Sequence, residues 1–193
     1  MIYDLWRVYN NLFLLIRNRE WHEEPNKLSK EDFDKNMRSK KHVLISGKNR
    51  HRCPSTIVLT NNESNVANHK DEFEKIIVPL SGEIILVSNK VLTNNIALLA
   101  KIYSIKIFSY RHANFIIDVT KAPLVHQHIL LPKEEIEKEL NEIGIDKLQL
   151  PLIKMNDPQI IWLGAYEGDI VKIIRISEAT GFSVAYRRVV INK

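Results

Sequence analysis

Cysteine and long hydrophobic segments are almost absent from this sequence. Cys53 is the only cysteine among the 193 residues, so a disulfide within the chain is impossible, which fits a reducing compartment. No uninterrupted apolar run approaches the roughly 20 residues that a membrane helix needs. Asp4 and Arg7 interrupt the region where a secretory signal would lie, and the apolar core at residues 12–16 is too short for one. We therefore expect neither a membrane partner nor a secretory leader.

Acidic residues are missing from one stretch in the first half of the chain. Seven cations and no acid lie between Lys35 and Arg52. A Lys or Arg that meets a phosphate releases a counterion, so such a block suits contact with nucleic acid. Aromatic side chains for base stacking are also missing from it, and a solvated loop with a turn at Gly47 is the alternative. Under the first interpretation, the DNA-binding residues are Lys40, Lys41, Lys48, Arg50 and Arg52.

The charge of the chain is unevenly distributed. The formal net charge of +5 divides into +6 for residues 1–121, with 19 Lys and Arg against 13 Asp and Glu, and −1 for residues 122–193, with 9 against 10. Any polyanion should therefore meet the first of these two regions.

Cysteine ligands for a zinc site are scarce in the sequence. His51 and Cys53 are two residues apart, as are His126 and His128, and together these four side chains could bind zinc. Structural zinc sites usually draw on closely spaced cysteine pairs, and this chain has one cysteine. We therefore predict no metal and no other cofactor.

The last third of the chain carries the clearest structural signals. Asp157 is a good N-cap, Pro158 fits the first position of a helix, and Gly164 lies where a left-handed C-cap belongs. A turn then leads into the apolar run 170–176, which is typical of a buried strand, and residues 182–186 alternate as a half-exposed strand does. These patterns predict a short helix packed against a β-hairpin.

Several motifs at fixed spacing in this stretch resemble the C-terminal domain of the fifth subunit of eukaryotic RNA polymerases, a domain that archaeal polymerases share. They are a Leu-Pro-x-Ile elbow, an Asp-Pro step, Leu-Gly and Gly-Asp pairs, a Val-Ile-Lys-Ile-Ile-Arg strand and a closing Tyr-Arg. Their counterparts are Leu150 to Ile153, Asp157-Pro158, Leu163-Gly164, Gly168-Asp169, Ile170 to Arg175 and Tyr186-Arg187. Glu167 and Ile176 depart from the family pattern, in a turn and at a strand end.

The resemblance implies a non-catalytic subunit of a multisubunit DNA-directed RNA polymerase. In this family the C-terminal domain docks on the largest subunit, and an N-terminal "jaw" domain lies beside downstream duplex DNA. No small-molecule substrate is implied. His128 matches a strand histidine of the family, and the terminal hairpin carries cations that are either solvated or face a partner. The partner-binding residues that we predict are His128, Lys172, Arg175, Arg187 and Arg188.

The entry to the strand at 126–131 departs from the family. Ala122, Pro123 and His126 stand where the family usually has His, Glu and Pro. This fits a divergent member, for example one encoded by a large DNA virus with its own polymerase. We expect a cellular protein to be nuclear, and a viral one to be in the host cytoplasm and the virion.

The N-terminal half alternates between helical and strand patterns, which implies an α/β layer architecture. We expect helices at 4–18 and 96–103 and one starting near Ser29, a loop at 61–70, and strands at 56–60, 76–78, 84–87, 105–108 and 115–119. The jaw domain of the family has the same order of elements and is related in fold to restriction endonucleases. The expected fold is thus an α/β jaw domain at 1–121, then a small mixed α/β domain at 122–193 that ends in a hairpin.

Two other classes of protein remain as alternatives. A free-standing basic nucleic-acid-binding protein, or an enzyme of nuclease fold, would explain the positive charge. Nucleases of the restriction type need an acid two residues before a lysine, and no lysine in this chain has one. An adaptor that borrows the C-terminal domain would bind a polymerase at less than one copy per enzyme.

Overall fold

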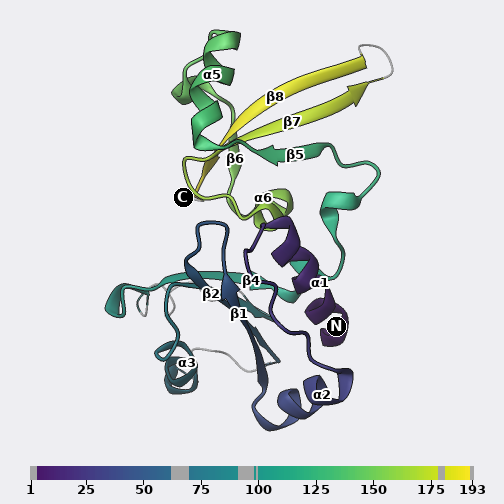
Figure 1. Ribbon diagram of the computed structural model, residues 1–193, viewed down its shortest axis with the longest axis vertical. Helices are drawn as coiled ribbons and strands as arrows, with labels where there is room; N and C mark the ends of the chain where they lie inside the picture. The colour runs from purple at the N-terminus through teal and green to yellow at the C-terminus, as the bar shows by residue number, and fades with distance from the viewer. Residues whose placement is uncertain (1–3, 62–69, 91–97, 99, 178–180, 192–193) are drawn as a thin grey trace. The chain divides into compact units, whose positions relative to one another are not determined.

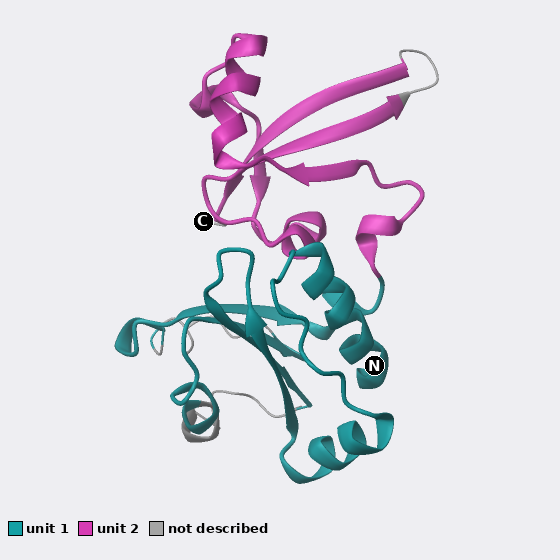
Figure 2. Ribbon diagram, viewed as in Figure 1, with its two compact units in different colours: residues 1–117 teal, residues 118–193 magenta. Residues whose placement is uncertain are grey.

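The computed structural model describes residues 4–61, 70–90, 98, 100–177 and 181–191, and it divides into two compact units (Figure 1; Figure 2). Unit 1 comprises residues 1–117 and unit 2 comprises residues 118–193. The sequence places the junction between residues 121 and 122 instead. Residues 118–121 belong with unit 2 because the Val119 carbonyl accepts a hydrogen bond of 2.9 Å from the Gln159 side chain.

Unit 1 contains a four-stranded mixed sheet. The strands lie in the order β1-β2-β3-β4, with β1 antiparallel to β2 and the other neighbours parallel. The elements are α1 (Leu5–Asn18), α2 (Lys30–Ser39), β1 (His42–Lys48), β2 (Pro54–Thr60), α3 (Lys70–Ile77), β3 (Glu83–Ser88), β4 (Lys106–Arg111) and the 3-10 helix η2 (His112–Phe115). The predicted mixture of helices and strands is confirmed, as are the strands predicted at 56–60, 84–87 and 105–108. That unit 1 is a jaw domain stays a prediction.

Helices α1 and α2 each begin directly after a capping residue. The side chains of Asp4 and Ser29 accept hydrogen bonds from backbone N–H groups of the first turn in α1 and α2, respectively. On α1, Tyr9, Leu12 and Ile16, which recur at helical spacing, are at most 1% exposed, so this stripe faces the core.

The strand predicted at residues 76–78 is wrong, because α3 continues as a helix through Ile77. Ile77 is buried against Ile84 and Leu86 of β3, and Ile76 packs at the edge of the same cluster. Three β-branched residues in a row favour a strand by their local preference alone. Here the helix is favoured because it buries Ile77 against β3.

Two further predictions fall partly or wholly on residues that are not described. Residues 98 and 100–102 are helical, in agreement with the helix predicted at 96–103, of which residues 96, 97 and 99 lie outside the described residues. The loop predicted at 61–70 falls almost entirely outside them, since residues 62–69 are not described.

The strand predicted at residues 115–119 is also wrong, because Phe115 belongs to η2 and Val119 begins another 3-10 helix. His112 is 2% exposed, and its Nε2 atom lies 2.9 Å from the Thr60 carbonyl oxygen. Burial lowers the pKa of His112, which favours the neutral imidazole. Together with the buried Phe115 ring, this contact anchors a tight turn where the sequence pattern predicts an extended strand.

Unit 2 contains the second mixed sheet, in the order β5-β7-β8-β6. Strands β5, β7 and β8 are antiparallel neighbours, and β6 runs parallel to β8. The elements are the 3-10 helix η3 (Val119–Lys121), β5 (Gln127–Leu130), α5 (Lys133–Ile143), the 3-10 helix η4 (Lys147–Gln149), β6 (Leu152–Lys154), α6 (Pro158–Leu163), β7 (Ile170–Ser177) and β8 (Gly181–Val190). The predicted helix caps at Asp157 and Gly164 are confirmed, as is the hairpin of β7 and β8.

The two helices of unit 2 cover opposite faces of this sheet. Successive side chains of a strand point to opposite faces. On β7, Val171 and Ile173 pack with Ile160 of α6. Ile170, which lies on the other face of the same strand, packs with Leu140 of α5. We call these the α6 face and the α5 face.

Candidate functional site

The basic block of unit 1 is not one loop. Residues 42–48 form β1, whose Val43 and Ile45 side chains are each 3% exposed. A strand rises about 3.4 Å per residue, so the seven residues of β1 separate its two ends by roughly 20 Å. Lys40 and Lys41 precede the strand and form what we call the helix-end cluster. Lys48, Arg50 and Arg52 lie at the other end and form the turn cluster.

The turn predicted at Gly47 is wrong, because this glycine lies within β1. A Cβ atom at position 47 would lie 2.9 Å from the Glu23 carbonyl oxygen and 3.0 Å from the Trp21 ring. Glycine is therefore required by close packing of the neighbouring segment against the strand, and not by a turn.

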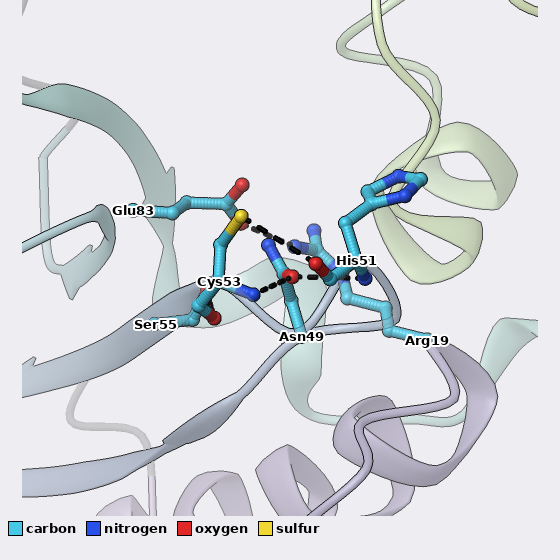
Figure 3. Close-up of polar contacts among 6 residues, drawn as sticks. All are labelled: Arg19, Asn49, His51, Cys53, Ser55 and Glu83. Carbon is cyan, nitrogen blue, oxygen red and sulfur yellow. Dashed lines mark hydrogen bonds and ion pairs between the residues drawn. The ribbon is translucent and has the colours of Figure 1, made fainter.

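The turn between β1 and β2 is held in place by one buried side chain. Asn49 is 7% exposed, and its Oδ1 atom accepts hydrogen bonds of 3.0 Å from the backbone N–H groups of His51 and Cys53 (Figure 3). The Asn49 carbonyl accepts another, of 2.8 Å, from the Arg52 N–H. Arg52 has a φ of 60°, a left-handed conformation that these bonds hold. The exposed side chains of the turn therefore project from an ordered backbone.

The three members of the turn cluster differ in their surroundings. The Nζ atom of Lys48 lies 2.7 Å from a carboxylate oxygen of Glu23, so its charge is already partly offset. The carbonyl of Arg50 lies 3.2 Å from the Nε2 atom of His22, which braces the turn from the side. Arg52 is exposed. Of the predicted DNA-binding residues in this cluster, Lys48 is thus the weakest candidate.

The helix-end cluster includes a third lysine, which the sequence analysis did not predict. Lys40, Lys41 and Lys75 line an open depression of about 290 Å³, together with His42. The remaining lining residues, Ser39, Thr60 and Ile76, carry no negative charge. Lys75 belongs to α3, which sequence patterns alone predict in part as a strand, so its position beside β1 could not be foreseen.

A buried ion pair lies near the turn, and it bears on the nuclease alternative. Arg19 and Glu83 are separated by 3.7 Å, and each side chain is 6% exposed (Figure 3). Burial raises the pKa of the neighbouring Tyr110, which also interacts with Arg19. Two residues after Glu83 stands Ile85, where the nuclease pattern needs a lysine. Glu83 is therefore occupied by a buried arginine and lacks the partner that metal-dependent cleavage requires.

The described part of the chain offers neither a metal site nor a membrane helix. Within it, no group of three or more His, Cys, Asp and Glu side chains is placed to bind a metal ion. No described helix is long and apolar enough to cross a bilayer.

The predicted partner-binding residues of unit 2 do not share one surface. Residues opposite each other on neighbouring antiparallel strands point to the same face. His128 is opposite Ile173, and Arg187 is opposite Val171, so both lie on the α6 face together with Arg175. Lys172 and Arg188 alternate with these residues and lie on the α5 face. The structure thus brings together three of the five residues at most.

Lys172 is engaged within unit 2. Its Nζ atom donates to both carboxylate oxygens of Glu139 on α5, at 2.7 and 2.8 Å, and the Tyr186 hydroxyl donates to the same carboxylate. The hydrogen bond from Lys172 lowers the pKa of Glu139, and the same bond raises the pKa of Lys172. This ion pair links α5 to the sheet. Lys172 is therefore a weaker candidate for partner binding.

Two of the other hairpin cations, Arg175 and Arg188, each have one donor without a partner among the described residues. In both residues this donor is the buried Nε atom. The Nδ1 atom of His128 lies 2.7 Å from the His126 carbonyl oxygen, which fixes the orientation of the ring.

Comparison with known proteins places similarity in unit 2. Residues 117–189 match the family described as RNA polymerase Rpb5, C-terminal domain. Over 72 residues the chain is 47% identical to the DNA-directed RNA polymerase subunit Rpo5 of Methanocaldococcus jannaschii, a match that covers 37% of this chain and 92% of that protein. The subunit Rpo5 of Archaeoglobus fulgidus is 54% identical over 67 residues, which cover 35% and 88%. A Dictyostelium discoideum protein, DNA-directed RNA polymerases I, II, and III subunit rpabc1, is 38% identical over 78 residues, which cover 40% of each chain.

Proposed function

We propose that this chain, which belongs to the Rpb5/Rpo5 family of DNA-directed RNA polymerase subunits, is a non-catalytic subunit that anchors to the largest polymerase subunit through unit 2. One observation carries the proposal. The match covers 92% of the Methanocaldococcus jannaschii protein, which is named a polymerase subunit although it contains little besides the shared domain. That domain is therefore the part that we assign to assembly. Polymerisation chemistry belongs, in this proposal, to the large subunits.

Unit 1 is proposed to be the jaw domain beside downstream duplex DNA. Two features support this assignment. The residues up to 121 hold the whole positive excess of the chain, and the turn cluster projects from a backbone that Asn49 orders. Phosphate contacts of this kind position a protein on DNA without selecting a base sequence. The protein is then found where its polymerase works, in the nucleus of a cell or in the cytoplasm and virion of a large DNA virus.

Purification under native conditions tests the function directly. The full chain, tagged and produced in its own host, should purify with much larger chains at a fixed one-to-one stoichiometry. A free-standing nucleic-acid-binding protein or nuclease would purify without them. An adaptor would purify with them at less than one copy per polymerase. Either of these outcomes would contradict the proposal.

The basic clusters of unit 1 should govern how salt affects the elongation complex. Replacing Arg50 and Arg52 with glutamine removes two cations from the turn cluster and leaves assembly intact. The lifetime of the elongation complex should shorten at moderate salt. Its dependence on salt concentration should become shallower by about one unit of slope for each lost phosphate contact. The same measurement on Lys40→Gln/Lys41→Gln tests the helix-end cluster separately.

The control variant also removes two positive charges, but from unit 2. Lys133 and Lys147 are exposed lysines of unit 2, and the variant Lys133→Gln/Lys147→Gln should keep the slope of the wild type. Lifetimes are measured on two unrelated templates. Slopes equal to that of the wild type in both cluster variants would mean that the clusters are solvated and touch no DNA. A loss seen on only one template would indicate base recognition and contradict the proposed mechanism.

A further inference from the structure

The open depression of unit 1 brings together lysines from two distant parts of the chain and, among its described lining residues, no acid. Lys40 is the C-cap of α2, Lys41 follows it, and Lys75 lies in the last turn of α3. All three side chains belong to exposed residues. Like charges repel one another, so cations gathered at one recess are stabilised when an anion joins them. The depression therefore has the charge of an anion-binding site.

The lysines of this depression are not neutralised within the described part of unit 1. No ion pair between described residues includes Lys40, Lys41 or Lys75. The acid next to Lys75 in the chain is Glu74, and its carboxylate accepts a hydrogen bond from the Tyr103 hydroxyl. No described acid therefore competes with an incoming anion for these three charges.

The backbone carbonyls beside the lysines are already engaged. Carbonyls at the end of a helix carry partial negative charge, which opposes an anion unless they have partners. The Lys40 carbonyl oxygen lies 2.8 Å from the Nδ1 atom of His42. The Lys41 carbonyl accepts hydrogen bonds from the Asn61 N–H at 3.1 Å and from the Thr60 hydroxyl at 3.3 Å. Lys41 has a φ of 60°, a left-handed conformation that these bonds hold, so the lysine side chains leave a fixed backbone.

The shape of the depression suits a small anion. The turn cluster projects from the β1–β2 turn, whereas the helix-end cluster lines a recess of about 290 Å³. That volume is close to the lower limit of small-molecule sites, about 300–1,000 Å³. Lysine binds phosphate as a point charge that needs no fixed approach angle. Three such charges around one recess match a compact anion that carries several negative charges.

We propose that the helix-end cluster, with Lys75, is a binding site for the phosphate groups of a small polyphosphate anion such as pyrophosphate. This site goes beyond the proposed function, because it needs neither a polymerase nor DNA to be occupied. The DNA backbone offers phosphate groups as well, so both sources are compared with the same protein variants.

Calorimetric titration of pyrophosphate into the full chain, at constant ionic strength, measures the site. The wild type should bind one pyrophosphate per chain. Lys75→Gln should weaken the binding at least about fivefold, because it removes one of the charges around the anion. Lys75→Arg keeps that charge and should bind nearly as well as the wild type. Circular dichroism should be the same for all variants, since Lys75 is exposed.

The matched control removes a lysine from the other end of α2. A helix rises 1.5 Å per residue, so Lys30 lies about 15 Å from Lys40 along the axis. That separation exceeds the screening length of about 8 Å at physiological salt. Lys30→Gln should therefore change the affinity for pyrophosphate less than about twofold. Absence of pyrophosphate binding to the wild type would overturn the proposal, and so would equal losses in Lys30→Gln and Lys75→Gln.

Nuclear magnetic resonance locates the bound anion. Pyrophosphate added to the nitrogen-15-labelled full chain should shift the backbone amide signals of residues 39–42, 60 and 75 most. The signals of residues 50–52 in the turn cluster should change little. Larger shifts in the turn cluster than around the depression would overturn the proposal.

Titration of a short DNA duplex into the same proteins separates the two phosphate sources. If the duplex binds, pyrophosphate does not, and Lys75→Gln weakens binding of the duplex, the helix-end cluster is a DNA contact. The polyphosphate site is then wrong and the proposed function stands. If pyrophosphate binds as expected but the chain does not purify with a polymerase, the proposed function fails and the polyphosphate site stands.

Discussion

Replacing Ile173 with aspartate should unfold unit 2 and remove the protein from its polymerase. Ile173 is 3% exposed and packs in a cluster with Ile160 of α6 and Val171 of the same strand. Its loss forfeits about 2 kcal/mol of apolar burial, and the unpaired carboxylate adds a penalty of several kcal/mol. Small domains are stable by only about 5–15 kcal/mol, so the sum approaches the whole stability of the unit. Thermal unfolding of the full chain and native purification both report the result.

The adjacent residue supplies the matched control. Ile174 lies on the other face of β7 and is only partly buried, so an aspartate there can reach water. We expect Ile174→Asp to lower the unfolding temperature much less than Ile173→Asp does. Equal unfolding temperatures for the two variants would show that the assignment of faces along β7 is wrong. Ile173→Val, which removes one methyl group, should cost only about 1 kcal/mol.

Arg19→Met should destabilise unit 1 by about 3–5 kcal/mol, because it removes the cation that lies beside the buried Glu83 carboxylate. The two side chains are each 6% exposed, and Arg19 also interacts with the half-buried Tyr110. The double variant Arg19→Met/Glu83→Leu removes both charges and should recover most of that loss. Chemical denaturation of the wild type, both single variants and the double variant gives the interaction energy.

The control for this prediction lies on the same helix. Arg17 pairs with Glu24 at 2.7 Å, but these side chains are 64% and 48% exposed. Exposed ion pairs contribute about 0–1 kcal/mol, so Arg17→Met should change the stability little. A similar loss in Arg17→Met and Arg19→Met would mean that burial does not set the strength of the Arg19 contact.

The parts of the fold that follow from local chemistry were predictable from the sequence. The start of a helix near Ser29 and the caps at Asp157 and Gly164 can be predicted from single residues and their spacing, and all three lie where expected. The strand pattern of the terminal hairpin is equally local. By contrast, Ile77 and Phe115 lie in segments whose structure depends on what they pack against, and there the predicted strands are wrong.

The candidate sites were less predictable, because each depends on contacts between distant residues. Lys172 appears in the sequence as an exposed or paired cation, and only the fold shows that Glu139 is its partner. The seven cations between Lys35 and Arg52 form one block in the sequence, but β1 separates five of them into the helix-end cluster and the turn cluster. In the sequence, Phe182 appears only as one of the apolar residues that alternate with polar ones in its strand. Its 75% exposure depends on which part of the hairpin the rest of unit 2 covers, which the hairpin sequence alone does not show.

The ordered turn of unit 1 also makes the protein convenient for spectroscopy. Cys53 is the only cysteine among these 193 residues and is exposed, and its backbone N–H is held by the Asn49 side chain. A maleimide dye or spin label will therefore attach at one position, without the removal of other thiols by mutagenesis. Because the backbone at that position is fixed, distances measured from the label will report on movement of unit 1 and not on local motion of the attachment point.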